Sequence, residues 1–500
     1  MGSATWPTPR KEDGTLVQPG AGGRRGEGRE VDASGRDPEG AALRKALVAV
    51  LLAAACGGSL LLGGSGSKFG GPSPWGAANT IHVAGDGILE QPVISATTDE
   101  AQNLWVATNS ALYLMKPGER SFRRFTVRDG LHLQGNRVEY CDADLAGGDR
   151  RCPIFGAAAD PGISEIEGGA EGEVFVGYFG IDDGSADWGD PNRHGGKLDR
   201  VRLTSSGSLQ VDRLDLVSTN TAQFWHNRTV ERMLYDHVQH PHELYVGANH
   251  GVDRIWPDKY RAPKKGEWFL AATKEWLSDH LHPQVCYHHA CDASESDLRL
   301  GDWKGLALSP DGNLWVGGRW TGGQIRWTPE LADWLNRPGN QIFAVAFGDP
   351  YRGPCGSGNC NQPVFMVPSE GDVISVQAVA VATDGRVWFA SGRTTGYDIP
   401  RGLAVWDGRS FRYYDPRRDA GMQENDVRDM VALPDGRLVL AGRNTGLVFW
   451  NPQTGAHSSL RAGPDLPDDH VLRLKLDLMV EPPTLYVATY AGVAALRKLP

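Results

Sequence analysis

The sequence lacks any excess of positive charge. It has 51 Lys and Arg against 61 Asp and Glu in 500 residues, so its formal net charge is −10 at pH 7. Proteins that bind nucleic acids usually carry a basic patch that neutralises phosphates, so we expect no nucleic-acid partner. The sequence also lacks a nucleophile-elbow motif, a phosphate-binding glycine loop, a dinucleotide fingerprint and a metalloprotease helix motif. No enzyme class is therefore indicated by a motif.

Near the N-terminus the sequence lacks an apolar run long enough for a membrane-spanning helix, which needs about 20 residues. The run Ala46–Ala55 has ten residues. Arg44 and Lys45 precede it, a combination typical of a secretory signal peptide. Cys56 follows directly, which resembles a bacterial lipoprotein signal, where cleavage leaves an N-terminal cysteine that is lipidated. The alternatives are plain secretion and an uncleaved anchor that continues through Leu60–Leu62.

Composition divides the chain into four parts. Residues 1–42 are rich in Gly, Pro, Arg and Glu, and we expect them to be disordered. Residues 43–56 are the signal peptide with its lipoprotein-like cysteine, residues 57–78 are a flexible Gly/Ser/Pro tether, and residues 79–500 are the folded domain. We therefore expect a cell-envelope protein that a lipid holds on a membrane, in the periplasm or on the outer surface. Secretion is the alternative.

Cysteines are few, and their number is typical of an exported chain. Of the seven, six remain if Cys56 is lipidated. An even number in an oxidising compartment predicts disulfides, and proximity favours local pairing. The expected pairs are Cys141 with Cys152, Cys286 with Cys291, and Cys355 with Cys360. Metal binding is the alternative for the segment Cys286–Cys291, which also contains two histidines.

One short pattern recurs along the chain. Ser309–Gly318 reads Ser-Pro-Asp-Gly-Asn-Leu-Trp-Val-Gly-Gly, a tight Asp-Gly turn followed by a β-prone apolar strand. Asp384–Ala390 and Asp435–Ala441 are close copies. Looser copies are Gln102–Ala107, Glu171–Gly177, Pro241–Gly247 and Pro483–Ala488. Internal repeats of this kind indicate a repeat architecture.

Each copy lies in a context of four strands. An apolar strand such as Val376–Val381 precedes the turn. A third strand that ends in an aromatic residue follows, as in Leu403–Trp406, and a more polar fourth strand completes the unit, as in Phe411–Tyr414. Four antiparallel strands per repeat are typical of a propeller blade, so we predict an all-β, seven-bladed β-propeller. The last unit lacks a fourth strand, and we expect residues 80–84 to supply it and close the ring.

The repeats resemble those of a known family. Their Asp-Gly-x-Leu-Trp-Val-Gly/Ala pattern, and the Phe-x-x-Phe-Thr and Asp-Gly-Leu sequences within Phe122–Leu131, resemble two-component-regulator propeller repeats and, more loosely, WD repeats. Such repeats occur in periplasmic sensor regions of hybrid histidine kinases and in free-standing exported proteins. The resemblance implies binding of a ligand or partner, and it transfers no catalytic residue.

The connections between strands lie on two faces of a propeller. The crossing face holds the second-to-third turns and the blade-to-blade crossings, and the turn face holds the first-to-second and third-to-fourth turns. The expected insertions are the crossings Tyr140–Pro161, Trp276–Asp302 and Asp349–Gly371 and the second-to-third turn Gly180–Gly196. All four map to the crossing face, which predicts that this face binds a partner.

Three arginines occupy equivalent turns on the crossing face. Arg319, Arg393 and Arg443 each stand in a Gly-Arg-x-Thr-Gly sequence. Converging guanidinium groups would bind a carboxylate, a sulfate or an acidic protein surface. Alternatively, each arginine braces its own loop by donating to neighbouring carbonyls. Trp188 and Trp320 are on the same face, where they would stack on a sugar or serve packing.

Histidines and aspartates supply further candidates. If the protein is an enzyme, the catalytic candidates are His250, His280, His288 and Asp187. Asp183, Asp187 and Asp190 offer oxygen ligands for calcium, although their spacing departs from that of an EF-hand loop. The preferred expectation is a solvated acidic loop and no cofactor.

Together these patterns predict a monomeric, lipid-anchored propeller that acts as a binding or scaffolding module toward an envelope protein, a peptide or a glycan. The alternative is a propeller enzyme of the lyase or glycosidase type with a His/Asp site at the axis. An axial pocket with converging histidine and carboxylate side chains would favour the enzyme, and a broad loop surface would favour the binding module.

Overall fold

The residues that the computed structural model describes lie within Gly63–Pro500. The described residues are 70–88, 90–131, 162–179, 198–214, 229–238, 242–248, 251–261, 275–281, 284–286, 303–318, 322–325, 342–346, 364–366, 375–393 and 400–500. The predicted disordered extension, signal peptide and lipidated Cys56 lie outside them. Within these residues, no helix has the length and hydrophobicity that crossing a bilayer requires.

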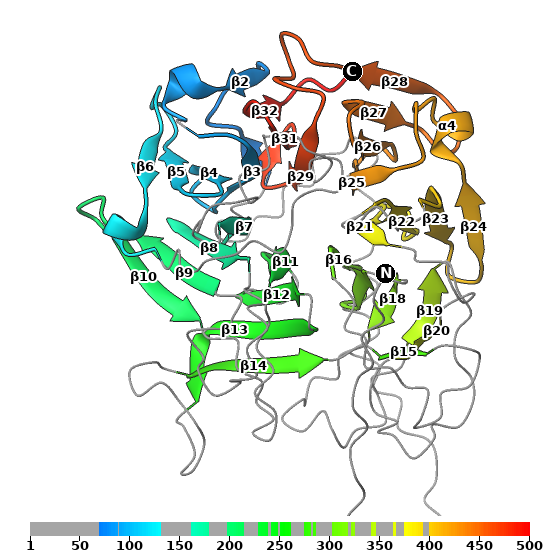
Figure 1. The fold of residues 1–500 in the computed structure, drawn as a ribbon, viewed down its shortest axis with the longest axis horizontal. Coiled ribbons are helices and arrows are strands. Elements are labelled where there is room, and N and C mark those ends of the chain that lie inside the picture. Colours follow the sequence, from blue (N-terminus) through cyan, green and yellow to red (C-terminus); the bar gives the residue numbers. More distant parts are fainter. Residues whose placement is uncertain are drawn as a thin grey trace, which may run out of the picture. The chain divides into compact units, whose positions relative to one another are not determined.

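The described strands form seven four-stranded antiparallel sheets, which are the blades of a β-propeller (Figure 1). From the axis outward, the strands of blades 1 to 4 are β3 (Val93–Thr98), β4 (Leu104–Thr108), β5 (Leu112–Met115) and β6 (Arg123–Phe125); β7 (Ile163–Gly168), β8 (Glu173–Tyr178), β9 (Leu198–Leu203) and β10 (Leu209–Leu214); β11 (Val230–Asp236), β12 (Glu243–Ala248), β13 (Val252–Arg261) and β14 (Glu275–Leu281); and β16 (Gly305–Leu308), β17 (Leu314–Gly317), β18 (Gly322–Ile325) and β19 (Ile342–Ala346). Those of blades 5 to 7 are β21 (Val376–Val381), β22 (Val387–Ser391), β23 (Leu403–Trp406) and β24 (Phe411–Tyr414); β25 (Val427–Ala432), β26 (Leu438–Gly442), β27 (Leu447–Trp450) and β28 (His457–Leu460); and β29 (Val471–Asp477), β31 (Thr484–Thr489), β32 (Val493–Leu496) and β2 (Thr80–His82). The predicted fold is thereby confirmed.

The ring closes through an N-terminal strand. Each inner strand contacts the inner strands of both neighbouring blades, and β29 of blade 7 contacts β3 of blade 1. The strand β2 pairs antiparallel with β32, with Thr80 opposite Ala495 and His82 opposite Val493. In Figure 1 the blue β2 therefore lies beside the red β32. The predicted closing strand is confirmed, and it spans residues 80–82 within the expected residues 80–84.

The repeated Asp-Gly sequences form the first-to-second turns for a local reason. Gly312, Gly385 and Gly436 have positive φ angles of 77°, 83° and 86°, which a residue without a Cβ adopts at no steric cost. The preceding aspartate accepts a hydrogen bond from the backbone N–H two residues on, as Asp384 does from Arg386 at 3.1 Å. The two-residue signature thus specifies the turn by itself, which is why it recurs in the sequence.

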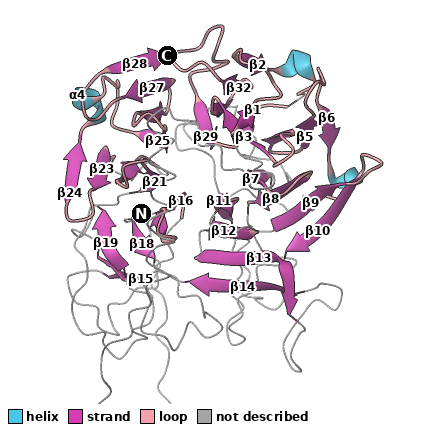
Figure 2. Ribbon diagram, turned by 180° about the vertical axis from the view of Figure 1, so that it is seen from behind, coloured by secondary structure: helices cyan, strands magenta, loops and turns pink. Residues whose placement is uncertain are grey.

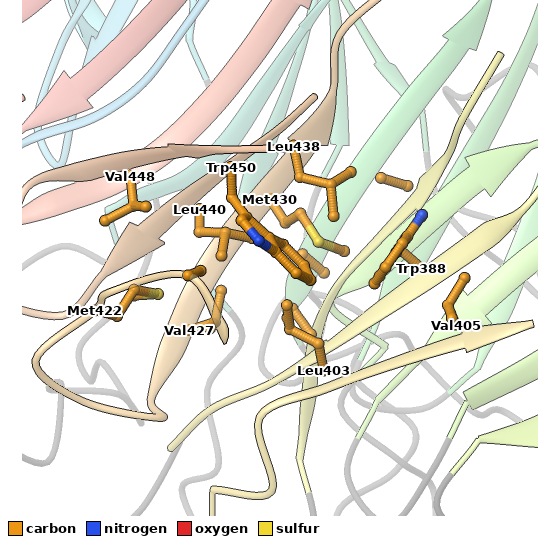
Figure 3. Close-up of a cluster of buried hydrophobic side chains, with 14 of the residues drawn as sticks. Trp388, Leu403, Val405, Met422, Val427, Met430, Leu438, Leu440, Val448 and Trp450 are labelled. Atoms are coloured by element: carbon orange, nitrogen blue, oxygen red, sulfur yellow. The ribbon is translucent and has the colours of Figure 1, made fainter. Parts of the chain in front are cut away.

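Apolar side chains pack between neighbouring blades, and the cluster between blades 5 and 6 is an example (Figure 3). Trp388 of β22 and Trp450 of β27 meet edge to face, with ring centroids 5.6 Å apart. Both are buried, as are Trp105 and Trp315. Trp406, which ends β23, is only partly buried. Because most of this burial lies between sheets, each blade depends on its neighbours for its core.

Few other elements accompany the blades in the described residues (Figure 2). They are the short helices η1 (Ala84–Asp86), η2 (Val127–Asp129) and α4 (Pro416–Asp419), and two parallel strand pairs, β1 (Gly71–Pro72) with β30 (Val480–Glu481) and β15 (Gln284–Cys286) with β20 (Val364–Met366). The strand β15 belongs to the crossing before blade 4 and β20 to the crossing before blade 5, so this pair joins two crossings.

A buried carboxylate organises the first-to-second turn of blade 1. The Asp99 carboxylate accepts hydrogen bonds from the indole of Trp105 (2.9 Å) and the side-chain amide of Asn103 (2.8 Å). Burial raises the pKa of Asp99 to about 6, against the opposing effect of these hydrogen bonds. In blade 4, Ser309 accepts the same hydrogen bond, from Trp315 (3.0 Å). In blade 4 a neutral hydroxyl therefore accepts the indole hydrogen bond that an ionisable carboxylate accepts in blade 1.

We expect this carboxylate to make stability depend on pH. A folded-state pKa above the unfolded value stabilises the fold below the unfolded pKa, and this contribution is lost as pH rises through about 6. The loss is about 3 kcal/mol for a shift of about two units. Urea denaturation from pH 4 to 7 should show a smaller decrease in the free energy of unfolding for Asp99→Ser, which copies Ser309, than for the wild type. Equal decreases in the two proteins would show that Asp99 is not the source of the pH dependence.

Candidate functional site

The inner strands place one residue each at the same level around the axis. In six of them a β-bulge separates the first residue from the third, as between Val471 and Arg473. The third residue, or its counterpart in the regular strand β16, is Ser95, Glu165, Arg232, Gly305, Ala378, Asp429 or Arg473 in blades 1 to 7. Charged residues thus meet at the axis within strands that are otherwise mainly apolar.

One ion pair spans the axis between blades 3 and 6. The guanidinium of Arg232 donates to both oxygens of Asp429, at 3.0 and 3.1 Å. Asp429 is fully buried and also accepts from the backbone N–H groups of Met430 (2.9 Å) and Leu474 (2.8 Å). Burial alone would lower the pKa of Arg232, but Asp429 and Glu165 raise it above its ordinary value. The guanidinium of Arg232 is therefore charged at any physiological pH.

Two further ion pairs join blades 7 and 2. Nε of Arg473 lies 2.5 Å from Oε2 of Glu165, whose other oxygen accepts from the Ser95 hydroxyl at 2.7 Å. Two residues further along the same strands, Lys475 donates to both oxygens of Glu167. Since blade 1 lies between blades 7 and 2, these pairs also join blades that are not neighbours. The axis is therefore bridged by charge pairs at two levels.

The bridged axis leaves a small cavity of about 170 Å³. Its charged lining residues are Glu165, Glu167, Arg232, Arg473 and Lys475, and its other wall is apolar, with Leu306 and residues 379–381. Ligand pockets usually measure about 300–1,000 Å³. Among the described residues that line the cavity there is no histidine, and the carboxylates already contact cations. Ion pairs therefore occupy the charged side of this cavity.

On the crossing face, two of the predicted arginines lie close together. Nε of Arg443 donates to Oδ2 of the buried Asp426 at 2.9 Å, and its Nη2 donates to the backbone carbonyl of Arg393. The backbone N–H of Arg393 donates to Oδ1 of Asp426 at 2.7 Å. The side chain of Arg443 is 5% exposed and that of Arg393 is 49% exposed. Arg443 therefore braces the turn that presents Arg393 to solvent.

Three consecutive residues of the crossing before blade 6, Glu424–Asp426, hold the turns of two blades; we call them the clasp. Asp426 binds the start of the blade 5 turn through Arg393, and Asn425 donates to the carbonyl of Pro400 near its end at 2.9 Å. Glu424 accepts from the hydroxyl of Thr445 in the blade 6 turn at 3.3 Å. The clasp thus pre-positions this part of the crossing face.

Several predicted site residues cannot be placed, because they lie outside the described residues: Arg319, Trp320, Trp188, His250, His288, Asp183, Asp187, Asp190, Cys141, Cys152, Cys291, Cys355 and Cys360. The backbone of Cys286 is in β15. Within the described ranges, no three His, Cys, Asp or Glu side chains are grouped as a metal site would require.

The position of His280 corrects one expectation. The crossing predicted at Trp276–Asp302 does not begin at Trp276, because residues 275–281 form β14, the outermost strand of blade 3. His280 is paired with Asp253 of β13, on the outer side of the blade, so its backbone is far from the axis. Four of the seven residues of β14 are polar, so the sequence gives no clear strand signal there.

The distribution of insertions is also different from the prediction. Residues 262–274 join β13 to β14, and residues 326–341 join β18 to β19. Both are third-to-fourth connections, which belong to the turn face. Long connections are therefore not confined to the crossing face, and insertion length alone does not identify the binding face.

Comparison with known proteins adds no family. No protein-family model matches the chain, and no curated protein matches it. The solved structures that it resembles include a chain of the crystal structure of the mitotic checkpoint complex, with 11% sequence identity and a TM-score of 0.44, covering 87% of this chain and 96% of that chain. We draw nothing further from a likeness at this level.

Proposed function

We propose that the protein is an exported, lipid-anchored β-propeller, built from repeats of the two-component-regulator type, that binds an envelope protein, peptide or glycan through its crossing face. The observation that carries the proposal is the bridged axis. Arg232 with Asp429 and Arg473 with Glu165 occupy the place where a propeller enzyme would hold its substrate. The surfaces of the ring remain for recognition, as in a scaffold.

The clasp supports the choice of the crossing face. It holds both ends of the blade 5 turn, so Arg393 extends from a backbone whose position is already fixed. Fixing a contact residue before binding reduces the entropy that binding must remove. The guanidinium of Arg393 is half-exposed, and its Nε lies 3.9 Å from Oδ2 of Asp426. A guanidinium can bind a carboxylate or sulfate through two parallel hydrogen bonds. The partner chemistry that we propose is therefore anionic.

Arg393→Met is the direct test of this face. We expect capture of envelope partners by residues 57–500 to fall about tenfold or more, because a charge-assisted hydrogen bond contributes about 1.5–3 kcal/mol. The measurement is a quantitative cross-linking pull-down from the envelope of the source cell. Arg443→Met is a poorer test, since the buried Arg443 also braces the turn and its loss would lower stability.

Arg386→Met is the matched control. Arg386 belongs to the same blade but lies in the first-to-second turn, on the turn face, where it pairs with Asp384. The Arg386→Met variant should leave the capture of envelope partners unchanged. Equal losses in both variants would indicate a nonspecific charge effect, and no loss with Arg393→Met would exclude this part of the crossing face.

A further inference from the structure

The described chain begins against the turn face. The backbone N–H of Gly70 donates to the carbonyl of Met479 at 3.0 Å, and β1 continues this contact by pairing in parallel with β30. The strand β30 lies between β29 and β31, the first and second strands of blade 7, and their connection belongs to the turn face. Residues 70–72 are therefore attached to that face (Figure 2).

The next residues stay on the same face until the ring closes. The indole N–H of Trp75 donates to the carbonyl of Gln102, in the first-to-second turn of blade 1, at 3.0 Å. Oδ1 of Asn79 accepts from the backbone N–H groups of Arg497 and Lys498, which follow β32, at 2.8 Å each. Only then does β2 run along β32 toward the crossing face. The described chain therefore starts at the turn face, at Gly70.

The turn face carries charges of both signs. Its first-to-second connections carry carboxylates, and the exposed ones are Glu171, Asp311, Asp384, Asp435 and Glu481. Arg386 and Arg437 pair with two of them, and the third-to-fourth connections of blades 1 and 5 add exposed basic residues, Lys116, Arg120 and Arg409. A surface of mixed charge is not the basic cluster that binds anionic headgroups. Residues 57–69 are long enough to hold the domain clear, since 13 extended residues reach about 45 Å.

We propose that the propeller is held with its turn face toward the membrane, at a distance and without adhesion, so that its crossing face points to the aqueous side. The lipid bilayer is then the neighbour of one face, and the anionic partner approaches the other. This inference rests on the proposed lipid anchor at Cys56. It goes beyond that proposal in assigning the two faces to two different environments, because residues 70–79 attach to one face only.

Energy transfer to the membrane surface tests the orientation. A fluorescent amino acid is placed at Thr383, exposed in the first-to-second turn of blade 5, or at Asn444, exposed in the second-to-third turn of blade 6. The lipidated protein is bound to neutral phospholipid vesicles that contain an acceptor-labelled headgroup. The faces are roughly 20 Å apart, since a five-residue strand spans about 17 Å, so transfer should be at least about twofold stronger from residue 383.

Flotation of the same vesicles separates the two possible failures. Wild-type protein should float with them, and the unlipidated Cys56→Ser variant should not. If the wild type floats but transfer is equal or stronger from residue 444, the orientation is wrong while the anchor stands. If the wild type fails to float, the anchor is wrong and the orientation falls with it. Flotation of Cys56→Ser would show adhesion and would contradict the stand-off arrangement.

Discussion

Replacing Asp429 by alanine should destabilise the protein by about 3–5 kcal/mol, the usual cost of leaving one member of a buried ion pair without its partner. Asp429 is the acceptor for both Nη atoms of Arg232 and for two backbone N–H groups. Without it, the guanidinium of Arg232 stays charged at the axis. Urea denaturation followed by tryptophan fluorescence measures the change in the free energy of unfolding.

Two further variants make this prediction specific to the pair across the axis. Asp384→Ala removes a carboxylate that is 41% exposed and pairs with Arg386, and should cost less than about 1 kcal/mol. The double variant Arg232→Met with Asp429→Ala should recover much of the stability, because no unpaired charge remains. A double variant no more stable than Asp429→Ala would show that the loss has another origin.

Replacing Trp450 by alanine should cost about 3–5 kcal/mol, as large-to-small changes in well-packed cores do. Trp450 is 1% exposed and lies beside Trp388, with ring centroids 5.6 Å apart (Figure 3). Its ring also contacts Tyr414, at a centroid distance of 5.3 Å. Alanine would leave a void between blades 5 and 6 that the rigid sheets fill poorly. The same denaturation measurement applies.

Trp450→Phe and Trp406→Ala are the matched comparisons. Phenylalanine keeps most of the ring and removes an indole N–H that has no hydrogen-bond partner among the described residues, so its cost should be markedly smaller. Trp406 ends the third strand of blade 5 as Trp450 ends that of blade 6, but it is only partly buried. Trp406→Ala should therefore cost less than Trp450→Ala. Equal costs would show that burial between blades is not the source.

The fold could be predicted from the sequence because its signals are local and repeated. Gly312, Gly385 and Gly436 mark turns by their own conformational freedom, and the apolar strands around them follow at constant spacing. The closure by β2 could be predicted because the last repeat was one strand short. The strand β14 was missed, since four of its seven residues are polar and it carries no apolar run.

The axis could not be predicted in the same way. Arg232 and Asp429 are 197 residues apart, and Lys475 and Glu167 are 308 residues apart. Only the ring brings them together, so no local pattern pairs them. A signal was nonetheless present, because charged residues recur at the third position of first strands that are otherwise mainly apolar. Aligning the first strands of the repeats by the apolar second strands that follow them would have found it.

The arginines of the crossing face also show that a local sequence pattern does not predict contacts with distant segments. Their shared Gly-Arg-x-Thr-Gly sequence implied equivalent positions in blades 5 and 6. The register differs by one residue, because Ser391 stands opposite Val376 where Gly442 stands opposite Val427, so Arg393 lies one residue further into its turn than Arg443. The shared sequence also did not distinguish Arg443 from Arg393, because the difference depends on Asp426, which a different segment supplies. A sequence motif shared by two blades therefore does not by itself give its arginines the same role.

The attachment of residues 70–79 has a mechanical consequence. Any tension along the chain upstream of Gly70 loads the parallel pair β1–β30 first, and then the indole of Trp75 lodged at the turn of blade 1. The strand β2, whose pairing with β32 closes the ring, comes after both attachments in the sequence. Pulling on the tether would thus have to break these two attachments before it loads the pairing of β2 with β32. The ring therefore stays closed under a force that breaks only the first two.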